Sequence, residues 1–79
     1  SPLAAAVNRA ETSALQKEIA RMLDEIACRI DMLEQRLRGV DPLWPDVDTD
    51  EIRALADEFT FLKKWRQLLL AAQTLLLGG

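Results

Sequence analysis

The chain has no histidine and a single cysteine, Cys28, among its 79 residues. One thiol cannot form an internal disulfide, and the absence of histidine removes the commonest metal ligand and the commonest general base. A domain this small usually depends on disulfides, metal or oligomerisation for its stability. Because the chain has almost no residues that could form disulfides or metal sites, the composition favours oligomerisation. We expect no catalytic, cofactor-binding or metal-binding residues.

Long apolar runs and clusters of one charge are also missing. No stretch of about 18 uninterrupted apolar residues is present, so no membrane span is predicted. The 10 basic residues are spread among 13 acidic ones. Because nucleic-acid binding needs a basic stripe that neutralises phosphates, we expect no nucleic-acid partner.

A lone thiol is typical of a reducing compartment, and the first residues lack the basic region and apolar run of a signal peptide. We therefore expect a cytoplasmic protein. Cys28 itself is expected to be a small filler at the edge of a helix seam, because no histidine is present to activate its thiol.

Glycine and proline are scarce and concentrated at a few places, which predicts two long helices. The first helix is expected over residues 2–38, the connection over 39–47 and the second helix over 48–77, in one domain of residues 1–79. Gly39 suits a left-handed C-cap. Asp48 is the expected N-cap of the second helix, with Glu51 completing a capping box and Val47 and Ile52 forming a hydrophobic staple.

The first helix carries one continuous apolar seam with helical spacing, continued towards its N-terminus by a thinner, alanine-rich row. Glu25 with Arg29 and Glu34 with Arg38 are expected as ion pairs between residues four apart. The seam consists of Leu15, Ile19, Met22, Ile26, Ile30, Leu33 and Leu37, and the thinner row of Leu3, Val7, Ala10 and Ala14.

The second helix carries two apolar stripes side by side, more than one neighbouring helix covers. The first stripe is Ile52, Leu55, Phe59, Leu62, Leu69 and Leu76; the second is Ala54, Phe61, Trp65, Leu68, Ala72 and Leu75. We therefore predict an all-α fold, a long antiparallel helical hairpin that a second chain completes into a four-helix bundle. The predicted partner-interface residues are Phe61, Trp65, Leu68, Ala72, Leu75 and Trp44.

Two features have competing interpretations. Trp44 in the connection is either a lid over the open end of the hairpin or an aromatic anchor for a partner. Asp46, Asp48 and Asp50 have the spacing of a calcium loop, but Glu51 stands where such a loop needs glycine. The staple and the capping box favour a helix start over a metal site.

The favoured function is a non-catalytic protein–protein interaction module, such as a small adaptor, a chaperone-like subunit or an assembly domain. Its protein partner is an identical chain or a different one, received as an amphipathic helix. No small-molecule substrate is expected, because a hairpin has no concave pocket of its own. One alternative is a structural homodimerisation domain of a larger protein. Another is a peripheral membrane protein whose C-terminal leucines rest on lipid.

Overall fold

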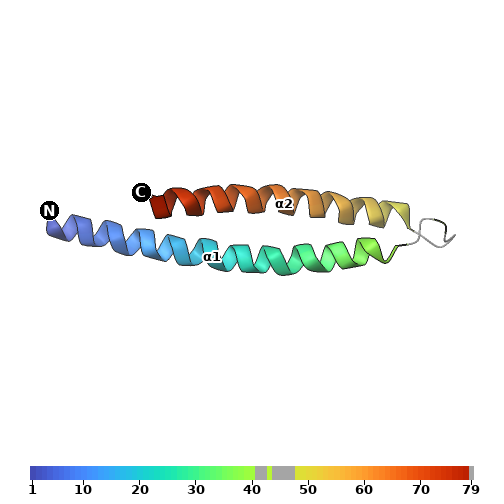
Figure 1. The fold of residues 1–79 in the computed structure, drawn as a ribbon, viewed down its shortest axis with the longest axis horizontal. Coiled ribbons are helices and arrows are strands. Elements are labelled where there is room, and N and C mark those ends of the chain that lie inside the picture. Colours follow the sequence, from blue (N-terminus) through green and yellow to red (C-terminus); the bar gives the residue numbers. More distant parts are fainter. Residues whose placement is uncertain (41–42, 44–47, 79) are drawn as a thin grey trace.

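The computed structural model describes residues 1–40, 43 and 48–78, which form two antiparallel helices. Helix α1 spans Pro2–Arg38 and helix α2 spans Thr49–Gly78 (Figure 1). The predicted helical hairpin is therefore confirmed, and each predicted helix bound is within one residue of the observed one. The molecule measures 68 × 16 × 14 Å, so the two helices form a long, narrow rod.

The core is a single row of side chains between the two helices. Five described residues are buried: Ile19, Ile26, Ile30 and Leu33 from α1, and Leu69 from α2. Met22 and Leu37 of the predicted seam are half-buried, whereas Leu15 at its beginning is exposed. A two-helix layer has no second layer to cover it, which explains why so few side chains are fully enclosed.

Helix α1 extends past the end of α2, as Figure 1 shows at the N-terminal end of the molecule. The amide Nε2 of Gln16 donates to the carbonyl oxygen of Leu76 at 3.5 Å, so Gln16 lies beside the last turn of α2. The part of α1 before Gln16, which we call the overhang, is therefore ~20 Å long at 1.5 Å per residue. Its apolar side chains Leu3 and Val7 are exposed.

The predicted Asp48 N-cap of helix α2 is confirmed, whereas the side chain of Glu51, expected to complete a capping box, pairs with Arg36. The Oδ1 atom of Asp48 accepts hydrogen bonds from the backbone N–H groups of Asp50 at 3.0 Å and of Glu51 at 3.1 Å. These are donors that the first turn of a helix leaves without intrahelical partners. The Oε1 atom of Glu51 accepts from Nη2 of Arg36 at 2.6 Å, which ties the start of α2 to the last turn of α1. The staple residue Val47 lies outside the described residues.

The end of α1 differs from the prediction. Gly39 has φ −76° and ψ −5°, so its backbone is right-handed and the expected left-handed C-cap is wrong. The N–H of Gly39 donates to the carbonyl of Gln35 at 3.1 Å, and the N–H of Val40 donates to that of Leu37 at 3.3 Å. Helix α1 thus closes with a tighter last turn, which satisfies the carbonyls of Gln35 and Leu37 without a left-handed residue.

One of the two predicted ion pairs within α1 is also wrong. Arg38 donates to Glu34 at 2.6 Å as expected. Glu25, however, pairs with Arg21, and Arg29 reaches across to Glu58 of α2. The guanidinium of Arg29 gains two parallel hydrogen bonds to one carboxylate there, a stronger arrangement than a single bond within its own helix.

Candidate protein-interaction surface

The first apolar stripe of α2 is the one that α1 covers. Leu69 is buried, and Phe59, Leu62 and Leu76 pack against the buried cluster around it. Ile52 and Leu55 are half-buried closer to the connection. Helix α1 therefore uses its single seam on this stripe and leaves the rest of the α2 apolar surface without a neighbour.

The second stripe of α2 is largely open to solvent. The exposed fractions are 65% for Phe61, 63% for Leu68 and 77% for Leu75, and Trp65 is at 37%. Ala72 is half-buried and packs against the core, so it lies at the boundary between the two stripes. We call Phe61, Trp65, Leu68, Ala72 and Leu75 the α2 stripe. The predicted interface residue Trp44 lies outside the described residues.

The spacing along the α2 stripe is that of a coiled-coil seam. From Phe61 to Leu75 the steps are four, three, four and three residues, an average of 3.5. That average keeps such residues in line when a second helix winds around the first with a left-handed supercoil. The stripe spans two heptads, with Phe61, Leu68 and Leu75 at one seam position and Trp65 and Ala72 at the other.

A charged face of α1 lies beside the α2 stripe. Nε and Nη2 of Arg29 donate to the two carboxylate oxygens of Glu58 at 2.8 and 2.9 Å, and Glu58 shares the side of α2 that carries Trp65 seven residues later. Glu25 lies one turn before Arg29 on the same side of α1. It forms a cluster with Arg21 and Glu18, in which Arg21 pairs with both carboxylates.

These ion pairs change the acidity of their carboxyl groups. Hydrogen bonds from Arg29 lower the pKa of Glu58, and hydrogen bonds from Arg21 lower the pKa of Glu18. The same bonds raise the pKa of both guanidinium groups. All of these groups are therefore charged at neutral pH, and the apolar stripe is bordered on its α1 side by fixed charges of both signs.

The structure also exposes apolar side chains that the sequence analysis did not assign to an interface. Leu70 and Leu77 of α2 are exposed, as are Met32 and Cys28 of α1. They do not continue the 4–3 spacing of the α2 stripe. On the other side of α2, the ammonium of Lys63 lies 4.4 Å from the centre of the Phe59 ring, so part of that surface is covered within the chain.

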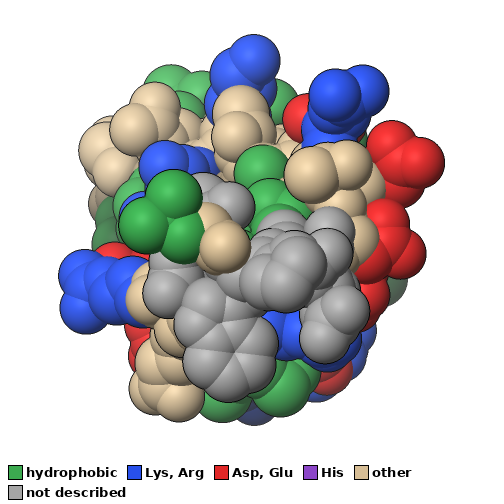
Figure 2. Space-filling view, turned by 90° about the vertical axis from the view of Figure 1, so that its right-hand side faces the viewer, with side chains coloured by type: hydrophobic (Ala, Val, Ile, Leu, Met, Phe, Trp, Pro, Cys, Tyr) green, Lys and Arg blue, Asp and Glu red, His purple; other side chains and the backbone are tan. Residues whose placement is uncertain are grey.

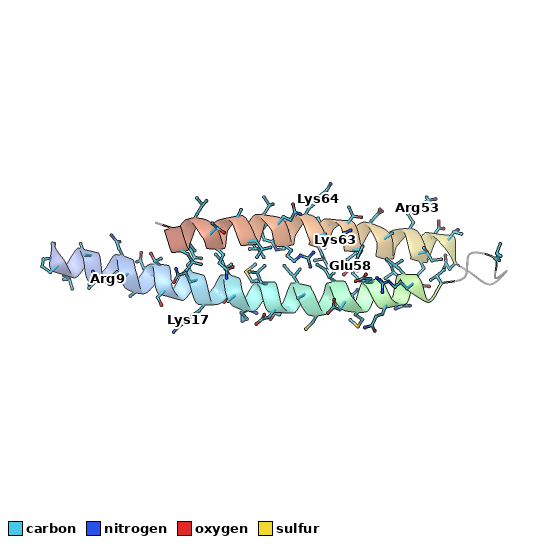
Figure 3. All side chains as sticks on the ribbon, viewed as in Figure 1. Arg9, Lys17, Arg53, Glu58, Lys63 and Lys64 are labelled. Atoms are coloured by element: carbon cyan, nitrogen blue, oxygen red, sulfur yellow. The ribbon has the colours of Figure 1, made fainter. Side chains whose placement is uncertain are left out.

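The charged side chains of α2 leave the stripe accessible. Lys64 and Arg53 project away from α1, whereas Glu58 lies on the side that faces α1 (Figure 3). At the end of the hairpin near the connection, acidic and basic side chains project around the outline with hydrophobic groups between them (Figure 2). At this end of the molecule neither sign of charge covers the whole outline.

The carboxylate and thiol side chains of the described residues are scattered rather than grouped. Within residues 1–40, 43 and 48–78, no three cysteine or carboxylate side chains are grouped as metal ligands. Asp48 uses its carboxylate as a helix cap, and Asp46 of the calcium-loop pattern lies outside the described part. A depression on the overhang is open and lined by Asn8, Arg9, Thr12, Ser13 and Gln16.

Neither helix, over the described positions, combines the length and hydropathy that a bilayer crossing requires. Comparison of the chain with protein-family models, with curated proteins and with solved structures finds no match.

Proposed function

We propose that this chain is a non-catalytic protein–protein interaction module, in which helices of a second chain pack on the α2 stripe and complete a four-helix bundle. The observation that carries the proposal is the exposure of a two-heptad apolar seam beside a seam that α1 already covers. Aromatic residues such as Phe61 and Trp65 commonly provide most of the binding energy of protein interfaces.

The thin core supports the same conclusion. Within the described part of the chain only five side chains are buried, which provides little enclosed apolar surface. A second pair of helices packed on the α2 stripe would cover the core residues between α1 and α2 from a further side. It would also bury the α2 stripe itself and so enlarge the core. Binding and folding stability are then coupled, as in oligomers whose monomers are only marginally stable.

The test compares two leucine substitutions in the same helix. Leu68→Asp places a charge in the α2 stripe. Leu70→Asp makes the same chemical change two residues away, at a side chain that is 45% exposed and about 200° around the helix. Light scattering over a concentration series gives the mass of each form, and affinity capture from the source cells gives the proteins that each form binds.

We expect Leu68→Asp to abolish the association that the wild-type chain shows, either with itself or with a captured protein, and Leu70→Asp to retain it. A charge buried without a partner in an apolar interface weakens binding by at least tenfold. The proposal is overturned if all three forms are monomers that capture the same proteins, because the α2 stripe then makes no interface.

A further inference from the structure

The solvent-accessible surface of the chain is far larger than that of a compact protein of its mass. The chain exposes 6297 Å², whereas a compact monomer of its 8.9 kDa exposes about 4,800 Å². Two copies therefore expose roughly 3,000 Å² in excess, which is the area that obligate homodimers bury. A second identical hairpin has the size and shape to remove this excess, since it presents two helices to two helices.

The order of large and small residues in the α2 stripe is self-complementary in one direction only. Suppose that α2 packs antiparallel on a second α2, with the two-fold axis level with Arg66 and Gln67. Phe61 then lies level with Ala72 of the second copy, and Trp65 lies level with Leu68 of the second copy. Each large side chain meets a smaller one, which is how well-packed interfaces fill their volume.

Parallel pairing of the same stripe packs poorly. Trp65 then meets Trp65 and Ala72 meets Ala72, which crowds one layer and leaves a void in another. Lys64 and Asp57 also come level with their own copies, which places like charges together. In the antiparallel register, Lys64 is level with Leu69 of the second copy and Asp57 is level with Leu76, so these repulsions are absent.

The charged face of α1 fits the antiparallel arrangement as well. The cross-hairpin contacts of Gln16 with Leu76 and of Arg29 with Glu58 set which parts of the two helices are level. By that register the two-fold axis falls at about residues 21–25 of α1. When two hairpins stack face to face, Arg21 of each copy lies near Glu25 of the other, and the charges attract.

We propose that the partner of this chain is a second copy of itself, packed antiparallel through the α2 stripe with the connections at opposite ends. The proposal rests on the proposed function and specifies its partner and geometry. Its consequence is a symmetric four-helix bundle, with Trp65 and Leu68 of both copies at the centre and the overhangs pointing in opposite directions.

Disulfide trapping between two single-cysteine variants tests the register. In a Cys28→Ser background, Phe61→Cys and Ala72→Cys are prepared separately with tags of different mass, and are oxidised alone and mixed. A disulfide requires Cβ atoms about 3.5–4.5 Å apart, so only residues at the same level are joined. We expect the mixed sample to give the 61–72 cross-link several-fold faster than either variant alone joins to itself.

Self-cross-linking of Phe61→Cys and of Ala72→Cys, without the mixed product, overturns the antiparallel geometry. If circular dichroism shows that Ala72→Cys loses helicity, Glu58→Cys with Leu75→Cys provides the same test, because residues 58 and 75 are also level in this register. The mixed pair is again expected to cross-link, and self-linkage alone overturns the register.

The mass measurement separates this proposal from the proposed function. A wild-type mass of twice 8.9 kDa that Leu68→Asp halves supports the second copy. A wild-type monomer at all concentrations overturns the second copy. In that case the proposed function still holds if capture of another protein is lost in Leu68→Asp and kept in Leu70→Asp, and it fails if capture is the same in all forms.

Discussion

Neighbouring residues of α1 have very different environments although their side chains are of similar size. Leu33 is 1% exposed between the helices, and Met32 next to it is 55% exposed. Adjacent residues lie about 100° apart around a helix, so Leu33 faces α2 while Met32 faces solvent. In a rod with one row of core side chains, each buried residue carries a large share of the total apolar burial.

Substitution of Leu33 by alanine is expected to lower the free energy of unfolding by about 3 kcal/mol, because it removes buried methyl groups and leaves a cavity. Met32→Ala, at an exposed position of the same helix, is expected to change it by less than about 0.5 kcal/mol. Urea unfolding followed by circular dichroism measures both values. Equal losses for the two variants contradict the burial of Leu33.

The ion pair between Arg29 and Glu58 predicts a pH dependence. Because hydrogen bonds from Arg29 lower the pKa of Glu58 in the folded state, the pair stabilises the fold at pH values above the ordinary pKa of a glutamate carboxyl. This contribution is lost as the pH falls through the lowered pKa. Glu58→Gln is expected to melt below wild type at pH 7 and at the same temperature near about pH 2.

Glu11→Gln on the overhang is the matched control, since Glu11 is exposed and lies beyond the end of α2. Its melting temperature is expected to equal that of wild type at both pH values. A difference between Glu58→Gln and wild type that stays constant from neutral to acidic pH contradicts the role given to the carboxylate.

Each helix uses its apolar surface in a different way. Helix α1 has one seam and uses it on α2. Helix α2 has two stripes and uses one of them on α1. The seam of α1 thins to the alanine-rich row of Leu3, Val7, Ala10 and Ala14 in the overhang, where α2 has ended. The apolar seam of α1 is therefore thinnest over the part of α1 that α2 does not reach.

The start of α2 depends on the side chain of Asp48. Asp48→Ala removes the acceptor of two backbone N–H groups and is expected to lower the free energy of unfolding by about 1 kcal/mol. Asp48→Asn keeps an acceptor oxygen at the same place and is expected to lose much less. Chemical unfolding of both variants checks this, and equal losses count against a capping role.

At the scale of the whole molecule, the hairpin is too elongated for its length. Its radius of gyration is 18.7 Å, against about 12 Å for a compact chain of this many residues. Folding of one chain leaves the α2 stripe and the overhang at the surface, and the proposed second chain would bury the α2 stripe.

The sequence by itself determined the two helices, the capping of α2 by Asp48 and the surplus of apolar surface on α2. These follow from spacing, glycine and proline placement and local capping, which act over a few residues. Helix pairing decided which stripe α1 covers, and with it the exposure of Phe61, Leu68 and Leu75. It also decided that Arg29 pairs with Glu58. Those outcomes depend on contacts between residues far apart in the chain, and local patterns cannot rank such contacts.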